Sequence, residues 1–131
     1  MINIQKKYEE LFKHSCYCFC VCYKFSNSKD EWKWLEYIAR GVQAGYITEE
    51  CYIEKPVQFI NKILGGNIKD VTKPDFKKEN LIDDINIVMY SYNSGTHFVC
   101  MNKLGDVIFD PSGDSNSVKY GIPVSIRKYI M

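Results

Sequence analysis

Apolar residues recur at helical spacing through the first half of the chain, which predicts a run of helices. A first helix carries on one face Ile4, Tyr8, Leu11 and Phe12. Ser15 has the side chain of an N-cap residue, so we expect a second helix from Cys16 to about Phe25.

Two further helices are predicted before the chain changes character. The run Ser28-Lys29-Asp30-Glu31 is a capping-box pattern, and the helix that it introduces closes near Gly45. One face of that helix carries Trp32, Leu35, Ala39, Val42 and Tyr46. Pro56 suits the first position of the next helix, which Gly65-Gly66 stops. Its apolar positions are Val57, Ile60, Ile63 and Leu64.

The second half of the chain is rich in β-branched and aromatic residues. Residues 85–92, 96–102 and 106–109 are predicted strands, and the sequences between them, Asn93-Ser94-Gly95 and Lys103-Leu104-Gly105, favour turns. Residues 68–72 and 123–129 add two short strands. Helices followed by an antiparallel sheet predict an α+β fold. Because the sequence has no repeat and no linker, we expect residues 1–131 to form one domain.

Composition and charge narrow the classes of partner. The formal net charge is +1 and there is no basic stripe, so we expect no binding to nucleic acid. No apolar run approaches the roughly 20 residues that cross a bilayer, and Glu9 and Glu10 fall where a signal peptide would be apolar. We therefore expect a cytoplasmic protein that does not bind membranes. Its six cysteines should be mostly free thiols in that compartment.

Cys16 is the candidate nucleophile, because it falls at the start of a predicted helix. The first turn of a helix favours the thiolate form of a cysteine, since its unpaired backbone N–H groups and the helix dipole stabilise negative charge. The alternative is that Cys16 is an ordinary small buried residue, the commonest role of a free cysteine.

His97 and Asp110 are the candidate base and the group that orients it. In an antiparallel hairpin the numbers of opposed residues have a constant sum. A two-residue loop at Leu104-Gly105, or a four-residue loop from Lys103 to Asp106, therefore makes Val99 oppose Asp110. His97 is then the diagonal neighbour of Asp110 on the same face, about 7–8 Å away at the backbone. A three-residue loop would instead put them on opposite faces. The alternatives are a plain strand histidine and an Asp-Pro turn.

The run Cys16-x-Cys18-x-Cys20-x-Cys22 raises the question of a metal site. Zinc sites usually take Cys-x₂₋₄-Cys pairs, whereas the spacing here is two throughout, and Cys51 and Cys100 are isolated. We therefore expect no metal and no cofactor, with Cys18, Cys20 and Cys22 as small packing residues. His14 has no obvious carboxylate to orient it, so we expect it at the surface.

These motifs resemble those of the papain-like cysteine peptidase superfamily. The residues that carry the resemblance are Ser15-Cys16-Tyr17, Ala44-Gly45-Tyr46-Ile47, Thr96-His97-Phe98-Val99 and Val107-Ile108-Phe109-Asp110-Pro111. The chain is most similar to bacteriocin-processing peptidases and to an uncharacterised family found in spirochaetes and phages. The resemblance implies a papain-like fold, with Cys16 as nucleophile, His97 as general base and Asp110 as the residue that orients the imidazole.

The chain departs from the family pattern at two positions. Ser15 stands where such peptidases commonly have Gly, and Glu10 stands where a Gln helps to hold the oxyanion. Gln5 is the nearby glutamine, and we assign it as a candidate oxyanion residue. The expected activity is hydrolysis of a peptide or amide bond through the Cys16-His97-Asp110 triad. The alternatives are a phage-type amidase of cell-wall peptides and an inactive papain-like binding module.

Overall fold

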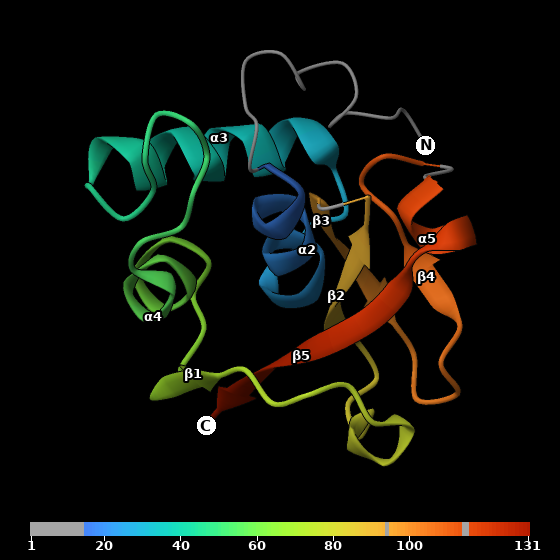
Figure 1. Ribbon diagram of the computed structural model, residues 1–131. Coiled ribbons are helices and arrows are strands. Elements are labelled where there is room, and N and C mark those ends of the chain that lie inside the picture. The colour runs from blue at the N-terminus through green and yellow to red at the C-terminus, as the bar shows by residue number, and fades with distance from the viewer. Residues whose placement is uncertain (1–14, 94, 114–115) are drawn as a thin grey trace.

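The computed structural model describes residues 15–93, 95–113 and 116–131, and in them helices precede an antiparallel sheet (Figure 1). The helices are α2 (Ser15–Phe25), α3 (Glu31–Gln43), α4 (Pro56–Gln58) and α5 (Asn116–Tyr120). A π-helical turn η1 (Phe59–Ile63) continues α4, and η2 (Lys78–Asn80) is a 3₁₀ turn. The predicted first helix and the positions of Gln5, Glu10 and His14 lie outside the described residues.

The sheet has five strands in the spatial order β1-β5-β2-β3-β4, and every neighbouring pair is antiparallel. The strands are β1 (Asp70–Thr72), β2 (Asn86–Tyr92), β3 (Gly95–Met101), β4 (Val107–Phe109) and β5 (Ile122–Ile130). All five predicted strands are present, with ends that differ by one or two residues. The prediction of an α+β fold is therefore confirmed.

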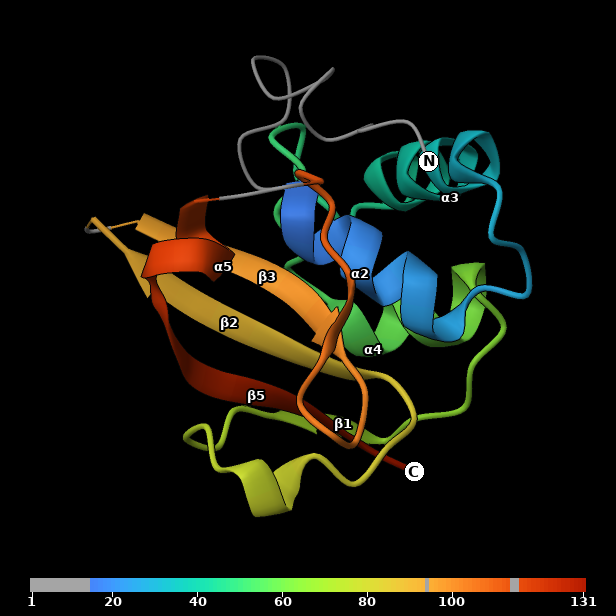
Figure 2. The same cartoon turned by 90° about the vertical axis from the view of Figure 1, so that its right-hand side faces the viewer.

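Helix α2 lies between the sheet and the other helices of the first half (Figures 1 and 2). It packs against β3 and β2, and also against α3. Its buried residues include Cys16, Cys18, Cys20 and Cys22, so the helix is covered on all sides. A helix that is buried all round needs small side chains where its neighbours approach closely, which accounts for the density of cysteine.

The start of α2 differs from the prediction. Ser15 is the first residue of the helix rather than its N-cap, and its side chain is fully buried. Its Oγ has no hydrogen-bond partner among the described residues. Cys16 is therefore the second residue of the helix and still lies in its first turn.

Helix α3 is present, and its predicted face was right in part. Leu35, Val42 and Tyr46 are partly buried against the core, whereas Ala39 is exposed. The N-cap is Asp30, whose side chain accepts from the Trp32 backbone N–H at 3.0 Å. The buried positions are Trp34, Ile38 and Gly41, whereas Trp32 is 56% exposed. A methyl group on Gly41 would lie 2.7 Å from Ile47 Cδ1, so the helix makes its closest approach at this glycine. The glycine thus fixes which of two adjacent apolar stripes faces the core.

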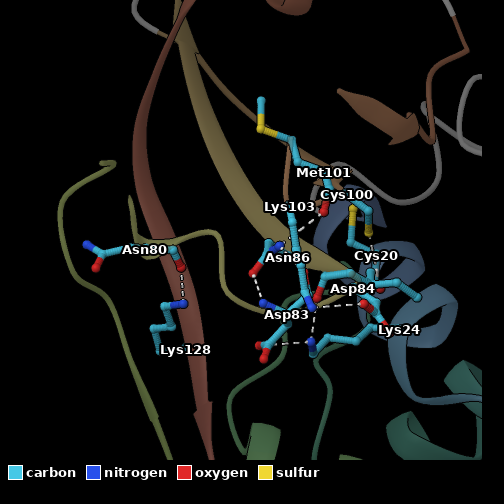
Figure 3. A network of polar contacts seen from close by, with 11 residues as sticks. Cys20, Lys24, Asn80, Asp83, Asp84, Asn86, Cys100, Met101, Lys103 and Lys128 are labelled. Atoms are coloured by element: carbon cyan, nitrogen blue, oxygen red, sulfur yellow. Dashed lines mark hydrogen bonds and ion pairs between the residues drawn. The ribbon is translucent and has the colours of Figure 1, made fainter. Parts of the chain in front are cut away.

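The far end of α2 is tied to the chain that enters β2. The Lys24 ammonium donates to the Ile85 carbonyl at 2.5 Å and lies 3.4 Å from Asp83 Oδ2. Figure 3 shows Lys24 pointing toward Asp83, while the buried amide of Asn86 donates to the carbonyls of Asp83 and Met101. This network fixes the helix relative to the sheet, and with it the position of Cys16 at the other end.

Candidate functional site

Cys16 is held at the junction of the core and a surface cavity. Cys16 is 8% exposed, and it is one of the residues that line the cavity. Because Cys16 lies in the first turn of α2, its sulfur is near backbone N–H groups that have no carbonyl partner within the helix. These N–H groups are donors that can serve an anionic group at this end of the helix.

His97 and Asp110 form a buried hydrogen-bonded pair. Nε2 of His97 lies 2.7 Å from Oδ1 of Asp110, and the two side chains are 8% and 7% exposed. The same carboxylate oxygen accepts from the Ser112 backbone N–H at 2.9 Å, which orients it within the turn after β4. With Nε2 engaged, Nδ1 is the ring nitrogen that remains for another partner.

The electrostatic environment of His97 favours its charged form. Burial lowers the pKa of His97, but the hydrogen bond and the charge of Asp110, together with the neighbouring Cys16, raise it to about 9. The imidazole is therefore protonated at neutral pH. Because Cys16 is among the groups that raise this pKa, it is a neighbour of the imidazole that is hydrogen-bonded to Asp110.

The hairpin that pairs His97 with Asp110 reaches this geometry by an unexpected route. Asn102 N–H donates to the Asp106 carbonyl at 3.0 Å, so the loop comprises residues 103–105, and the prediction of a two- or four-residue loop was wrong. Gly105 has a φ of +88°, as a loop of this type requires. A register shift follows, since Met101 pairs with Val107 but Cys100 pairs with Phe109. Ile108 is the extra residue of this bulge, and it restores the parity that the loop removes.

A cavity of about 710 Å³ opens beside Cys16. One wall is formed by residues 52–58, and the opposite wall by strand residues from β1, β2, β3 and β5. Tyr17, Tyr52 and Phe98 give it aromatic surface, and Arg127 contributes a guanidinium. The size and the mainly apolar lining are typical of a site for a small molecule or a short peptide segment.

The other cysteines are structural in their surroundings. All six cysteines are buried and none forms a disulfide. Cys18 Sγ donates to the Cys51 carbonyl at 3.0 Å, and Cys100 Sγ to the Cys20 carbonyl at 3.7 Å. Burial raises the pKa of Cys18 and of Cys20 well above the usual thiol value, so both remain neutral. The described part of the chain has no group of three or more His, Cys, Asp or Glu side chains suited to a metal ion.

Arg127 is the cavity residue that sequence reasoning missed. It lies on β5, and Ser125 and Tyr129 are its alternate neighbours. A signal was present, because an arginine two positions from a serine and a tyrosine on a predicted strand shares their face. The sequence does not tell which face of the sheet lines the cavity, so this pattern alone could not identify Arg127 as a cavity residue. The predicted Gln5 lies outside the described residues, so its place relative to the site is not part of this geometry.

No protein-family model matches the chain, and neither a curated protein nor a solved structure matches it significantly. Within residues 15–93, 95–113 and 116–131, no helix combines the length and the apolar character needed to cross a bilayer.

Proposed function

We propose that the protein is a cysteine hydrolase of the papain-like type, which cleaves a peptide or amide bond. The observation that supports it best is the buried hydrogen bond of 2.7 Å between His97 and Asp110, with Cys16 among the groups that raise the His97 pKa. A thiol, an imidazole and an orienting carboxylate in series are the parts that nucleophilic acyl transfer needs.

The first half-reaction starts from the Cys16 thiolate and the protonated imidazole of His97. The Cys16 thiolate attacks the carbonyl carbon, forming a C–S bond and a tetrahedral oxyanion. The Cys16 backbone N–H, in the first turn of α2, is a candidate donor to that oxyanion. When the C–N bond breaks, the protonated His97 donates its Nδ1 proton to the leaving amine, and an acyl thioester remains.

The second half-reaction restores the enzyme. Neutral His97 takes a proton from water, and the resulting hydroxide attacks the thioester carbon. The C–S bond breaks, the carboxylic acid leaves, and the thiolate and the imidazolium are regenerated. Asp110 accepts from the His97 Nε2–H throughout, so it holds the ring in place and stabilises its positive charge.

The test is the rate at which iodoacetamide alkylates Cys16 in the native protein at pH 6. A free thiol with a pKa near 8.5 is less than about 1% thiolate at that pH. A Cys16 thiolate stabilised by His97 should therefore react roughly 100-fold faster than N-acetylcysteine amide under the same conditions. Mass spectrometry of the digested protein measures the site and the rate, and Cys51 and Cys100 serve as buried controls.

Two variants complete the design. His97→Ala should lower the rate at which iodoacetamide alkylates Cys16 at pH 6 by more than about tenfold, because the imidazolium no longer stabilises the thiolate. Cleavage of a peptide mixture and of cell-wall peptides should vanish in Cys16→Ala. If Cys16 reacts no faster than the small thiol and neither substrate class is cleaved, the hydrolase proposal is wrong and a binding role takes its place.

A further inference from the structure

Arg127 holds its guanidinium at the cavity through neutral contacts. Nη1 donates to Ser125 Oγ at 2.8 Å, and Nη2 lies 3.7 Å from Met89 Sδ. The guanidinium carbon lies 5.0 Å from the centre of the Phe98 ring, a cation–π distance. Three different strands therefore position one charged group, which indicates a built site rather than a side chain left in solvent.

The positive charge on Arg127 has no counter-ion among the described residues. The residue is half-buried, yet no carboxylate lies within ion-pair distance of it in the described ranges. A partly desolvated guanidinium is normally paired, because losing water costs free energy that an anion offsets. Arginine also has five N–H donors, so its contacts with Ser125 and Met89 leave donors for a further acceptor.

The other charges on the cavity wall are exposed and nearly balanced. The cavity is also lined by two cations, Lys55 and Lys73, and by two carboxylates, Glu54 and Asp70, and all four residues are exposed. Exposed charges are screened by water and contribute little to recognition. Arg127 is therefore the charge that distinguishes this cavity, beside the aromatic surface of Tyr17 and Phe98.

We propose that the cavity beside Cys16 binds an acidic residue of the substrate, with Arg127 holding its carboxylate. The inference rests on the proposed function, because it names the substrate class of the same site. A carboxylate matches the planar donor fork of a guanidinium, and the methylene groups of a glutamate side chain suit the rings of Tyr17 and Phe98. A cavity of about 710 Å³ has room for such a side chain and its peptide neighbours.

The test measures binding without requiring catalysis. Full-length Cys16→Ala protein is titrated with N-acetylglutamate α-amide and, separately, with N-acetylglutamine amide, and chemical shifts of cavity residues are followed by NMR. The two compounds differ in one carboxylate. We expect the glutamate compound to bind at least about fivefold more tightly, since a hydrogen bond to a charged group is stronger than one to a neutral amide.

Variants locate the effect. Arg127→Gln should bring the two affinities to within about twofold of each other, and Arg127→Lys, which keeps the charge, should retain part of the preference. Lys73→Gln is the matched control, because it removes an exposed cation from the same wall, and the preference should stay within about twofold of the parent. Equal affinities in the parent, or an equal loss of preference in Lys73→Gln, would overturn the proposal.

The two proposals can fail separately. If the protein prefers glutamate but Cys16 is no more reactive than a small thiol, the proposal of a site for an acidic residue stands and the hydrolase proposal is wrong. A reactive Cys16 with no glutamate preference would do the reverse.

Discussion

At the scale of single residues, opposing effects act on the charge of His97. Its residue is 6% exposed, and burial alone disfavours a charge on the ring. The hydrogen bond and the charge of Asp110, together with the neighbouring Cys16, outweigh that cost and raise the pKa to about 9. The charged imidazole therefore depends on two neighbours, and each neighbour can be removed by one substitution.

The raised pKa of His97 makes the stability of the protein depend on pH. The folded protein holds a proton on His97 up to about pH 9, whereas an unfolded histidine loses it near 6.5. The stabilisation is complete below pH 6.5 and is lost as pH rises toward 9. In the parent, a Cys16 thiolate would offset the proton held on His97, so the test uses Cys16→Ala. In that variant the free energy of unfolding should fall as pH rises from 6.5 to 8, by up to about 1.4 kcal/mol per pH unit. In the double variant Cys16→Ala/Asp110→Asn the slope should be much flatter, because it lacks the negative charge of the carboxylate.

Urea denaturation of both proteins at several pH values measures that slope. The range stops at pH 8 because buried thiols such as Cys18 ionise on unfolding at higher pH and add to the slope. NMR titration of the histidine ring protons measures the pKa directly. Parallel curves for Cys16→Ala and for the double variant would contradict the role given to the carboxylate.

At the scale of elements, strands were easier to predict than helix faces. Alternation of side chains along a strand has a period of two, so it was enough to put His97 and Asp110 on one face. The loop length was wrong, and the pair still forms because the bulge at Ile108 compensates. Loops and bulges change register in steps of one residue, and a short sequence does not distinguish their combinations.

Helix α3 shows that the spacing of apolar residues does not decide which face of a helix is buried. Two adjacent apolar stripes run along it, one through Trp32 and Leu35 and the other through Trp34 and Ile38. Helical spacing fits both equally well. The choice depends on Ile47 and Phe59, which pack against the bare backbone at Gly41, and that contact exists only in the folded chain. For the same reason, Arg127 could be assigned to the cavity wall only from the folded structure.

The two tryptophans of α3 provide a direct test of the observed face. Trp34 is fully buried, and its indole N–H donates to the Ser28 carbonyl at 2.7 Å. Trp34→Ala should lower the free energy of unfolding by about 3–5 kcal/mol through the cavity and the lost hydrogen bond. Trp32→Ala, at a position 56% exposed, should cost less than about 1 kcal/mol.

Urea denaturation at pH 6 measures both changes. If Trp34→Ala does not fold, Trp34→Phe keeps an aromatic ring and should show an intermediate loss. Equal losses for the two alanine variants would contradict the assignment of Trp34 to the core.

At the scale of the whole molecule, Lys24 connects the helical half to the sheet. Its side chain is 13% exposed and spans from the last turn of α2 to the segment before β2. The Ile85 carbonyl and the Asp83 carboxylate that it contacts lie far from it in sequence. The Lys24 ammonium thus joins helix α2 to the segment that enters strand β2 of the sheet.

Lys24→Met should test that connection. The variant keeps the apolar stem but leaves the Ile85 carbonyl without its donor, so we expect a loss of about 1–3 kcal/mol in the free energy of unfolding. Lys33→Met is the control, because Lys33 pairs with Glu36 on the exposed face of α3 and should change stability by less than about 0.5 kcal/mol. A Lys24→Met protein as stable as the control would show that the layers do not need this link.

The order of the site residues along the chain has a consequence for folding. His97 and Asp110 are 13 residues apart and belong to one hairpin, whereas Cys16 is separated from them by most of the chain. Closing the longer loop costs about 2 kcal/mol more entropy than closing the shorter one. Contacts within a hairpin also form sooner than contacts between distant segments. We therefore expect His97 to meet Asp110 early in folding and Cys16 to meet His97 only when α2 docks, so that any reactivity that Cys16 gains from the imidazole arises with the completed fold.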